Sequence, residues 1–352
     1  MSLIGTDEGV DVRLLSYATT DLPDPRVGIE VDVGGISVVV AAQKAYARTL
    51  SDAMRPEMAA RFAAALVPDD MTQVLAGGDD SLRALRTVQA YAREQLRTPA
   101  DVAEWSRLRL TVEGHHLVRF PPVPRPGKIL GVGSNYPSAD DGGLRPETPV
   151  VFATFSLCLA ADQATVTAPA DADDLDFEGE LAVVIGRPGT DIRVEDALRH
   201  VAGYTIANDL TRRRVLADER QRGAILFGKN FVGSAPCGPV LVTSDEIPNP
   251  QALTIDVSCN GIPDSSAATA AMLRSVAELI ATCSRVPLEA GDLILTGAPK
   301  RPPGATAHRL EDHDRLVVRI PPIGDLVTTV GRCPSTHDLT PAGLATSKGI
   351  VS

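Results

Sequence analysis

The sequence is short of cysteine and has no long apolar run, and each shortage excludes a class of protein. Its 352 residues include five cysteines and no Cys-x-x-Cys pair, so reduced thiols are expected rather than a disulfide framework. No segment approaches the ~20 apolar residues that a membrane-spanning helix needs. The first residues have neither the basic region nor the apolar stretch of a signal peptide. We therefore expect a cytoplasmic protein with no membrane partner.

The sequence also lacks an excess of positively charged residues. The formal net charge is −11 at pH 7, which argues against nucleic acid as a partner because nucleic acid needs a basic surface. There is no Gly-x-Ser-x-Gly elbow and no phosphate-binding P-loop. Gly131-x-Gly133 is not a dinucleotide fingerprint, since Tyr136 stands at the third glycine and Pro137 follows where a helix should continue. The expected partner is a small-molecule substrate.

Proline marks the clearest boundary in the chain. The proline-rich run at residues 120–127 is typical of a stiff, extended linker. It separates an N-terminal α+β domain, residues 1–119, from a larger domain at residues 128–330, and residues 331–352 form a loose polar tail. Strand-like segments dominate the larger domain, with few helices between them. This pattern favours a β-rich α+β fold over a doubly wound sheet.

Local patterns predict individual elements in the N-terminal domain. Residues 11–35 alternate as strands do, and alanine-rich helical stretches follow within residues 41–66 and from a Ser81 cap onward. These patterns predict strands first and helices second in this domain.

In the larger domain, Ser275-x-x-Glu278 is a capping box that predicts a helix. Asn260-Gly261 predicts a hairpin turn. Strands are expected at residues 128–132, 149–155, 181–185, 202–207, 239–243, 253–260, 293–296, 315–320 and 325–330.

Two glutamates stand one residue apart at the start of an apolar run. Glu178 and Glu180 open a segment that is typical of a buried strand, and the two-residue period of a strand puts both side chains on one face. Adjacent carboxylates at the mouth of a core strand repel each other and are costly to desolvate. A hard divalent cation between them would keep both ionised, so we expect Mg²⁺, Mn²⁺ or Ca²⁺.

Asp209 ends another apolar strand and is the expected third ligand. Three carboxylates around one divalent ion leave a net negative charge, so a further cation is expected nearby. Lys229 suits that role because it lies between aromatic residues with Gly228 beside it. The alternative is that the two glutamates straddle a strand edge in water and Lys229 is an ordinary surface residue. Spacing alone leaves both interpretations open.

Several segments between about residues 128 and 330 resemble the fumarylacetoacetate hydrolase family, in that family's order. They are GVGSNY at 131–136, PVVF at 149–152, DFEGELAVVIG at 176–186, VAGYTIANDLTRR at 201–213, GKNF at 228–231, CGP at 237–239, SVAELI at 275–280 and GDLILTG at 291–297. Each segment is short, but together and in order they are specific. The resemblance implies a mixed β-roll for the larger domain.

The resemblance also implies roles for particular residues. Glu178, Glu180 and Asp209 would bind the metal, and Lys229 would be catalytic through contact with the substrate or a metal-bound oxygen. Substrate-binding positions are expected at Asn135, Tyr136, Arg213, Thr296 and Gly297. A homodimer is implied by the resemblance alone.

The sequence departs from the family pattern at three positions. Ala139 stands where the C–C hydrolases of the family carry a lid histidine that activates water, and a methyl group cannot take a proton. Ala298 replaces a threonine, and Thr154 replaces a lysine. Asp140 and Asp141 follow in a glycine-rich loop, and either carboxyl could act as base or acid if an apolar pocket raised its pKa. The alternative is that they form a solvated turn.

The expected reaction passes through an enolate. A hard cation that chelates a 2-oxo acid or a 1,3-diketone stabilises the enolate common to hydrolysis, decarboxylation, tautomerisation and hydration. Cutting a C–C bond with water needs a base, which Ala139 does not supply. The sequence therefore favours a decarboxylase, isomerase or hydratase, or an atypical secondary-metabolite reaction. An acylpyruvase-like C–C hydrolase and a non-catalytic metal- or ligand-binding protein stay as alternatives.

Overall fold

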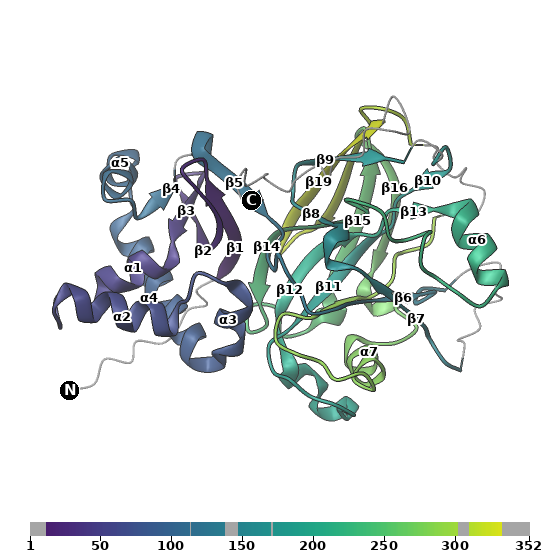
Figure 1. Ribbon diagram of the computed structural model, residues 1–352, viewed down its shortest axis with the longest axis horizontal. Coiled ribbons are helices and arrows are strands. Elements are labelled where there is room, and N and C mark those ends of the chain that lie inside the picture. The colour runs from purple at the N-terminus through teal and green to yellow at the C-terminus, as the bar shows by residue number, and fades with distance from the viewer. Residues whose placement is uncertain (1–11, 113, 138–146, 170–171, 302–309, 333–352) are drawn as a thin grey trace, which may run out of the picture.

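The computed structural model describes the chain except residues 1–11, 113, 138–146, 170–171, 302–309 and 333–352 (Figure 1). The α-helices are α1 Ala42–Leu50, α2 Pro56–Leu66, α3 Met71–Ala76, α4 Gly78–Gln95, α5 Pro99–Arg107, α6 Arg213–Gln221 and α7 Val276–Cys283. The 3₁₀ turns are η1 Gly114–His116, η2 Ser156–Cys158, η3 Val194–His200, η4 Pro250–Ala252 and η5 Thr269–Ala271. Within the described residues, no helix is long and apolar enough to cross a membrane.

The strands outnumber the helices. They are β1 Arg13–Thr19, β2 Leu22–Val33, β3 Ile36–Ala41, β4 Thr111–Val112, β5 Leu117–Phe120, β6 Ile129–Gly133, β7 Val150–Thr154, β8 Leu159–Ala160, β9 Ala164–Ala168, β10 Leu175–Asp176, β11 Gly179–Ile185, β12 Val201–Asn208, β13 Thr211–Arg212, β14 Ala235–Thr243, β15 Thr254–Cys259, β16 Ile262–Ala268, β17 Leu293–Leu295, β18 Arg315–Ile320 and β19 Gly324–Arg332. The predicted β-rich α+β fold class is therefore confirmed.

The largest sheet runs through both parts of the chain. Its twelve strands follow the order β4-β3-β2-β1-β14-β12-β11-β17-β6-β7, with β5 beside β1 and β8 beside β14. The link between the two parts is the antiparallel pairing of β1 with β14, where Arg13 faces Val242 and Leu14 faces Leu241. In Figure 1 this junction lies between the helical N-terminal part and the larger, strand-rich part.

The proline-rich run is packed against the sheet. Pro121, Pro122 and Val123 are buried, and the Ser16 hydroxyl donates a hydrogen bond of 2.8 Å to the Pro122 carbonyl. The chain between the two parts is therefore fixed by contacts. The exact domain boundaries stay a prediction.

A second sheet covers one face of the larger part. It has five strands in the order β16-β15-β18-β19-β9, and apolar side chains from it join those of β11 and β12 in one core. The two sheets come close at Gly179 of β11, where a Cβ atom would lie 2.7 Å from the side chains of Val257 and Val318. Only glycine fits there, and its position fixes which face of β11 points away from the second sheet.

The N-terminal helices pack beside β1–β4 (Figure 1). The predicted helical stretch at 41–66 is interrupted between α1 and α2, because Pro56 starts a new helix rather than continuing the first. The predicted Ser81 cap is wrong. Gly78, with φ of 55°, lets α3 turn directly into α4, so Ser81 lies inside the helix and is buried.

Most local predictions for the larger part are confirmed. Each of the nine predicted strands overlaps an observed one. Ser275 caps α7 in a capping box with Glu278, and Asn260-Gly261, with φ of 53° and 78°, connects β15 to β16. Helix α6 was missed, because its sequence RRVLADERQ offers few apolar residues to show a helical period.

Candidate metal centre

Sheet register brings the three predicted metal ligands together. Strands β11 and β12 are antiparallel, with Gly179 opposite Asn208, so Glu178 and Glu180 flank the end of β12 where Asp209 follows. The Asp209 amide donates a 2.8 Å hydrogen bond to the Glu178 carbonyl and fixes this turn. Each acid offers an oxygen within 4.8 Å of the others. Because Gly179 faces the second sheet, both glutamates point to the opposite side, as the two-residue period predicted.

Lys229 is buried among these carboxylates. Its ammonium donates to Glu178 Oε2 at 2.6 Å, to Thr211 Oγ1 at 2.7 Å and to Asp209 Oδ2. The same group lies 5.4 Å from the centre of the Phe152 ring. Lys229 is 2% exposed, so the alternative of an ordinary surface lysine does not describe its position.

Glu180 is held by a backbone donor. The Gly297 amide donates a 2.6 Å hydrogen bond to Glu180 Oε2. Gly297 has φ of 93°, which a side chain would make unfavourable, and a Cβ there would lie 2.8 Å from Asn135 Cβ. The Thr-Gly pair therefore aims an N–H group at the acid.

The side chains of Asn135 and Thr296 form hydrogen bonds to backbone groups next to the metal centre. The Asn135 amide donates to the carbonyls of Thr296 and Arg274, at 2.8 and 3.1 Å, and its oxygen accepts from the Arg274 amide. The Thr296 hydroxyl donates to the Leu181 carbonyl at 2.9 Å. Both polar side chains are thus bonded to backbone, while the nearby Tyr136 hydroxyl is buried without a partner in the described structure. A substrate-binding role for these three residues stays a prediction.

The three carboxyl groups cannot all stay ionised by themselves. Burial would raise the pKa of Glu178, but the charges of Lys229 and Arg213 outweigh it and hold that pKa well below its usual value. Burial, and next the charges of Asp209 and Glu178, raise the pKa of Glu180 well above its usual value. Burial raises the pKa of Asp209 to about 6 although Lys229 opposes it. The cluster therefore lacks positive charge.

One oxygen of the cluster has no partner. Asp209 Oδ1 is buried and accepts no hydrogen bond within the part of the chain that the structure describes. A buried carboxylate oxygen without a donor is costly. Carboxylate oxygens are the ligands that hard divalent cations prefer. The residues present thus fit the predicted cation.

Arg213 lies in the same site, held between two acids. Its guanidinium contacts Glu178 Oε1 and Asp176 Oδ2, each at 2.7 Å. Asp176 also accepts from Arg301, which in turn contacts Asp264 at 2.8 Å. The sequence patterns did not identify Arg301 and Asp264. Arg301 follows the GDLILTG segment by four residues, which was the available signal, whereas nothing around Asp264 in β16 pointed to the site.

A small cavity of about 150 Å³ opens over the carboxylates. Besides the acids and Lys229, its lining includes four further cationic residues: Arg213, Arg220, Lys300 and Arg301. Ala298 lines it too, while Thr154 does not. The cavity thus pairs an acidic floor with basic walls, an arrangement suited to an anionic ligand that also contacts a cation.

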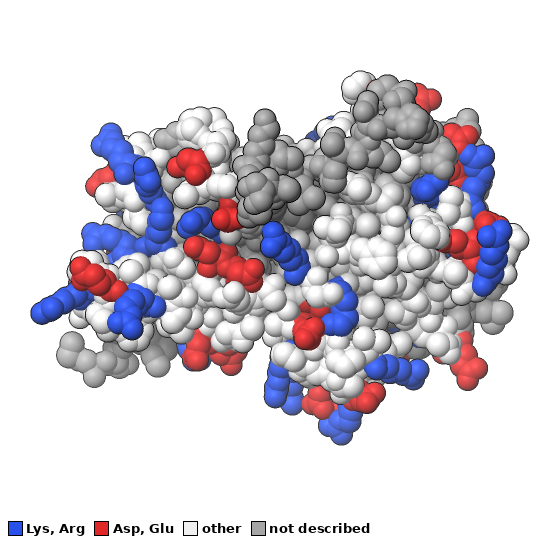
Figure 2. All heavy atoms as spheres, viewed as in Figure 1, with Lys and Arg blue, Asp and Glu red and all other residues white. Residues whose placement is uncertain are grey.

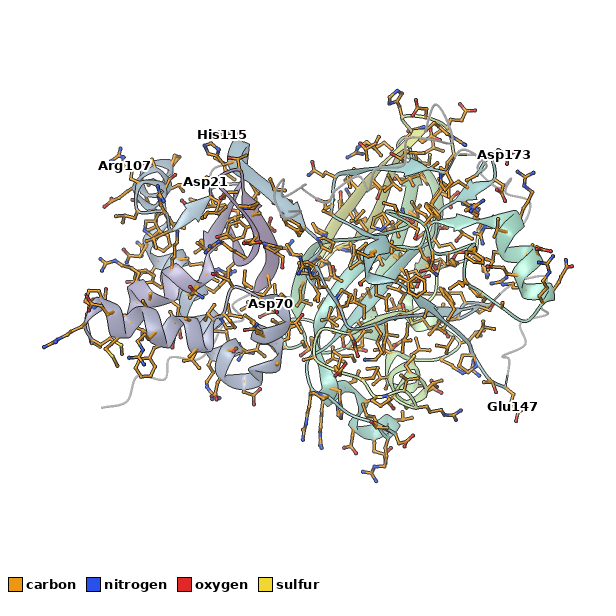
Figure 3. The ribbon with its side chains drawn as sticks, viewed as in Figure 1. Asp21, Asp70, Arg107, His115, Glu147 and Asp173 are labelled. Atoms are coloured by element: carbon orange, nitrogen blue, oxygen red, sulfur yellow. The ribbon has the colours of Figure 1, made fainter. Side chains whose placement is uncertain are left out.

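Ala139, Asp140 and Asp141 lie outside the described residues, so their roles stay predictions. Glu147 marks the point where the described chain resumes (Figure 3), and its carbonyl accepts a 2.9 Å hydrogen bond from Arg274.

Comparison with known proteins agrees with this site. The family model described as fumarylacetoacetate (FAA) hydrolase C-terminal matches residues 128–331. The human mitochondrial oxaloacetate tautomerase FAHD2B is 31% identical over 328 residues, which cover 91% of this chain and 92% of that protein. The oxaloacetate tautomerase YisK of Bacillus subtilis is 34% identical over 274 residues, covering 75% and 87%.

A solved structure has the same fold. The maleylpyruvate hydrolase of Sphingobium sp. SYK-6, in complex with manganese(II) ion and pyruvate, superposes with a TM-score of 0.64 at 22% identity over 91% of this chain and 99% of that one. Fold, motif order and relatives agree. The chain belongs to the fumarylacetoacetate hydrolase family of enzymes.

Proposed function

We propose that this enzyme is a divalent-cation-dependent tautomerase of a small 2-oxo dicarboxylic acid such as oxaloacetate. The observation that carries the proposal is the cluster of Glu178, Glu180 and Asp209 beneath a cavity with basic walls, with a buried Asp209 oxygen that has no partner among the described residues. Two relatives bear the name oxaloacetate tautomerase. A manganese(II) ion and pyruvate accompany the related fold of maleylpyruvate hydrolase.

The cation would be Mg²⁺ or Mn²⁺, with Ca²⁺ as the weaker Lewis acid, and it would polarise the 2-oxo group of the substrate. Lys229 keeps positive charge beside the carboxylates at a place that excludes water, where charge acts strongly. Arg213 and Arg301 are both already paired with acids, so the walls of the cavity are held in place before substrate enters.

Two further cations are available for a second carboxylate. Arg220 and Lys300 line the cavity and are exposed. The cavity, at about 150 Å³, lies below the roughly 300–1,000 Å³ of pockets for drug-sized ligands. A substrate of a few carbon atoms with two carboxylates matches both its size and its charge.

Tautomerisation is also consistent with the absence of the lid histidine from the sequence. It moves one proton from carbon to oxygen and consumes no water. The lid histidine that Ala139 replaces would activate water for C–C cleavage, so its loss leaves tautomerisation possible. The second candidate is the acylpyruvase-like C–C hydrolase, favoured by the family itself.

Loss of the enol absorbance of oxaloacetate tests the proposal. The enzyme with Mg²⁺ or Mn²⁺ should interconvert enol and keto forms at about 1 s⁻¹ or faster, and EDTA or Glu180→Gln should remove this rate. Glu289→Gln removes one carboxylate that is 72% exposed and lies outside the metal centre, so it should leave the rate unchanged. Cleavage of an acylpyruvate at that speed, without tautomerase activity, would establish the hydrolase instead.

We also propose a homodimer, based on an exposed apolar patch. Hydrogen bonds join Asn230 to Phe155 and Ala153, so the chain around β7 and η2 lies against the 226–232 segment. The exposed apolar residues there are Val150, Val151, Phe155, Leu157, Phe227 and Val232. In Figure 2 the viewed face over β8 has few charged side chains, whereas charges gather over the N-terminal helices and α6. Contiguous exposed apolar surface is typical of an interface.

Sedimentation velocity tests the dimer. Leu157→Glu, at a side chain that is 76% exposed, should give monomers. Ile262→Glu, at 61% exposure on β16, introduces the same charge elsewhere and should leave a dimer. A wild-type monomer at micromolar concentration would refute the proposal.

The proposed compartment is the cytoplasm. The four cysteines in the described part of the chain are free and buried, which suits a reducing environment. Fractionation of cells that express the tagged full chain tests this location, and recovery with the membrane or an organelle would contradict it.

A further inference from the structure

A second cavity lies in the N-terminal part, away from the metal centre. It has a volume of about 420 Å³, and its walls come from β1, β2 and the turn between them, α1, α5, β4 and η1. Its lining includes Tyr17, Asp21, Arg26, Lys44, Arg109 and His116, none of which lines the first cavity. Figure 3 shows Asp21 near His115 at one end of the N-terminal strands, which is where this cavity lies.

The charge of this cavity is opposite to that of the whole chain. Arg26, Lys44 and Arg109 line it together with one carboxylate, Asp21, in a protein of formal net charge −11. Arg26 pairs with Asp69 at 3.1 Å. Within the described residues, neither Lys44 nor Arg109 forms an ion pair. Three cations that converge on one cavity repel each other unless an anion joins them.

Lys44 and Arg109 are exposed, whereas Arg26 is half-buried. Arg26 Nε is buried and has no hydrogen-bond partner in the described structure. Burial, and next the charges of Arg26 and Arg109, lower the pKa of Lys44. Both guanidinium charges therefore act on the Lys44 ammonium, and the carboxylates of Asp69 and Asp21 oppose them.

The backbone at Arg109 is also unusual. This residue has φ of 56°, a left-handed conformation that arginine adopts rarely and asparagine or glycine more readily. The chain turns there between α5 and β4 and brings the guanidinium to the cavity wall. Non-glycine residues held in this conformation are concentrated at binding sites.

We propose that this cavity binds a small organic anion, either a dicarboxylate or a phosphate monoester. The three cations would hold its charged groups. Arg26 is paired with Asp69, so Lys44 and Arg109 exceed Asp21 by one positive charge, which the ligand would balance. Tyr17, Leu22 and Val112 supply apolar wall for the carbon skeleton. The volume falls within the range of roughly 300–1,000 Å³ of small-molecule sites.

Calorimetric titration of the full chain with succinate and with phenyl phosphate, in EDTA, tests the proposal. We expect one of them to bind with Kd of about 1 mM or tighter, and which one binds distinguishes the two ligand classes. Lys44→Met keeps the aliphatic stem and should weaken binding by about tenfold or more. Arg109→Asn tolerates the left-handed backbone and should do the same.

The control is Arg61→Met, on the exposed side of α2, which removes one positive charge outside the cavity and should leave Kd within about twofold. Thermal unfolding confirms that each variant is folded. Because Lys44 and Arg109 lie on different elements, one variant still tests anion binding in this cavity if the other fails to fold. The proposal is overturned if neither probe shows saturable binding. It is also overturned if a folded Lys44→Met or Arg109→Asn variant binds as the wild type does, since the ligand would then occupy another site such as the metal centre.

Discussion

Replacing Lys229 by methionine removes the positive charge that two carboxylates of the metal centre share. Its Nζ lies 2.6 Å from Glu178 Oε2 and also contacts Asp209, whose side chain is 1% exposed. Loss of one partner of a buried ion pair costs about 3–5 kcal/mol, because the remaining charge stays desolvated. Arg319 contacts Asp325 at 2.7 Å, but this pair is largely exposed, so Arg319→Met should cost only about 0–1 kcal/mol.

Thermal unfolding in EDTA, followed by circular dichroism, measures this contrast. For a unit of 150–250 residues, 1 kcal/mol corresponds to about 2–4 °C. Lys229→Met should therefore lower Tm by roughly 6–20 °C, and Arg319→Met by no more than about 4 °C. Adding Mg²⁺ should reduce the deficit of Lys229→Met, since the cation replaces the missing positive charge.

A double variant separates lost charge from lost packing. Lys229→Met combined with Asp209→Asn leaves no unpaired charge at Asp209, so it should be more stable in EDTA than Lys229→Met alone. The reasoning is refuted if Lys229→Met and Arg319→Met lower Tm equally, or if the double variant shows the full sum of the two single losses.

Three further outcomes are expected. Ser275→Ala removes the hydroxyl cap of α7 and should lower the free energy of unfolding in urea by about 1 kcal/mol, while Ser275→Asp should retain it. Gly179→Ala puts a methyl group 2.7 Å from Val257 and Val318 and should cost about 1–3 kcal/mol; an unchanged urea midpoint would contradict the packing argument. Mg²⁺ at a hundred times its Kd should raise the free energy of unfolding by about 2.7 kcal/mol. Glu180→Gln should lose most of that gain.

Patterns between near neighbours in the chain predicted much of the structure correctly. The apolar alternation located the strands of the larger part, and the capping box located α7. The same reasoning failed for α4, which begins at a glycine pair, and for α6, which is rich in charged residues. Ser81 was expected to begin a helix that starts at Gly78, and α6 shows too few apolar residues to reveal its period.

For the site, too, the sequence predicted relations between near neighbours but not those between distant residues. That Glu178 and Glu180 share a face follows from the geometry of any strand. Charge balance predicted a cation near Glu178 and Asp209, with Lys229 as the candidate, but spacing left this open. Lys229 is 51 residues from Glu178, and no local rule shows that it contacts both acids.

The sequence by itself determined the strand-rich fold class and the pair of acids on one strand face, because these depend on residues a few positions apart. Only the tertiary structure decided that Arg301 and Asp264 complete the ion-pair network around Asp176, and that Arg26, Lys44 and Arg109 converge on a second cavity. Such contacts depend on sheet register and on packing between distant segments. These contacts form only when distant segments of the chain pack together, and no local period in the sequence specifies that packing.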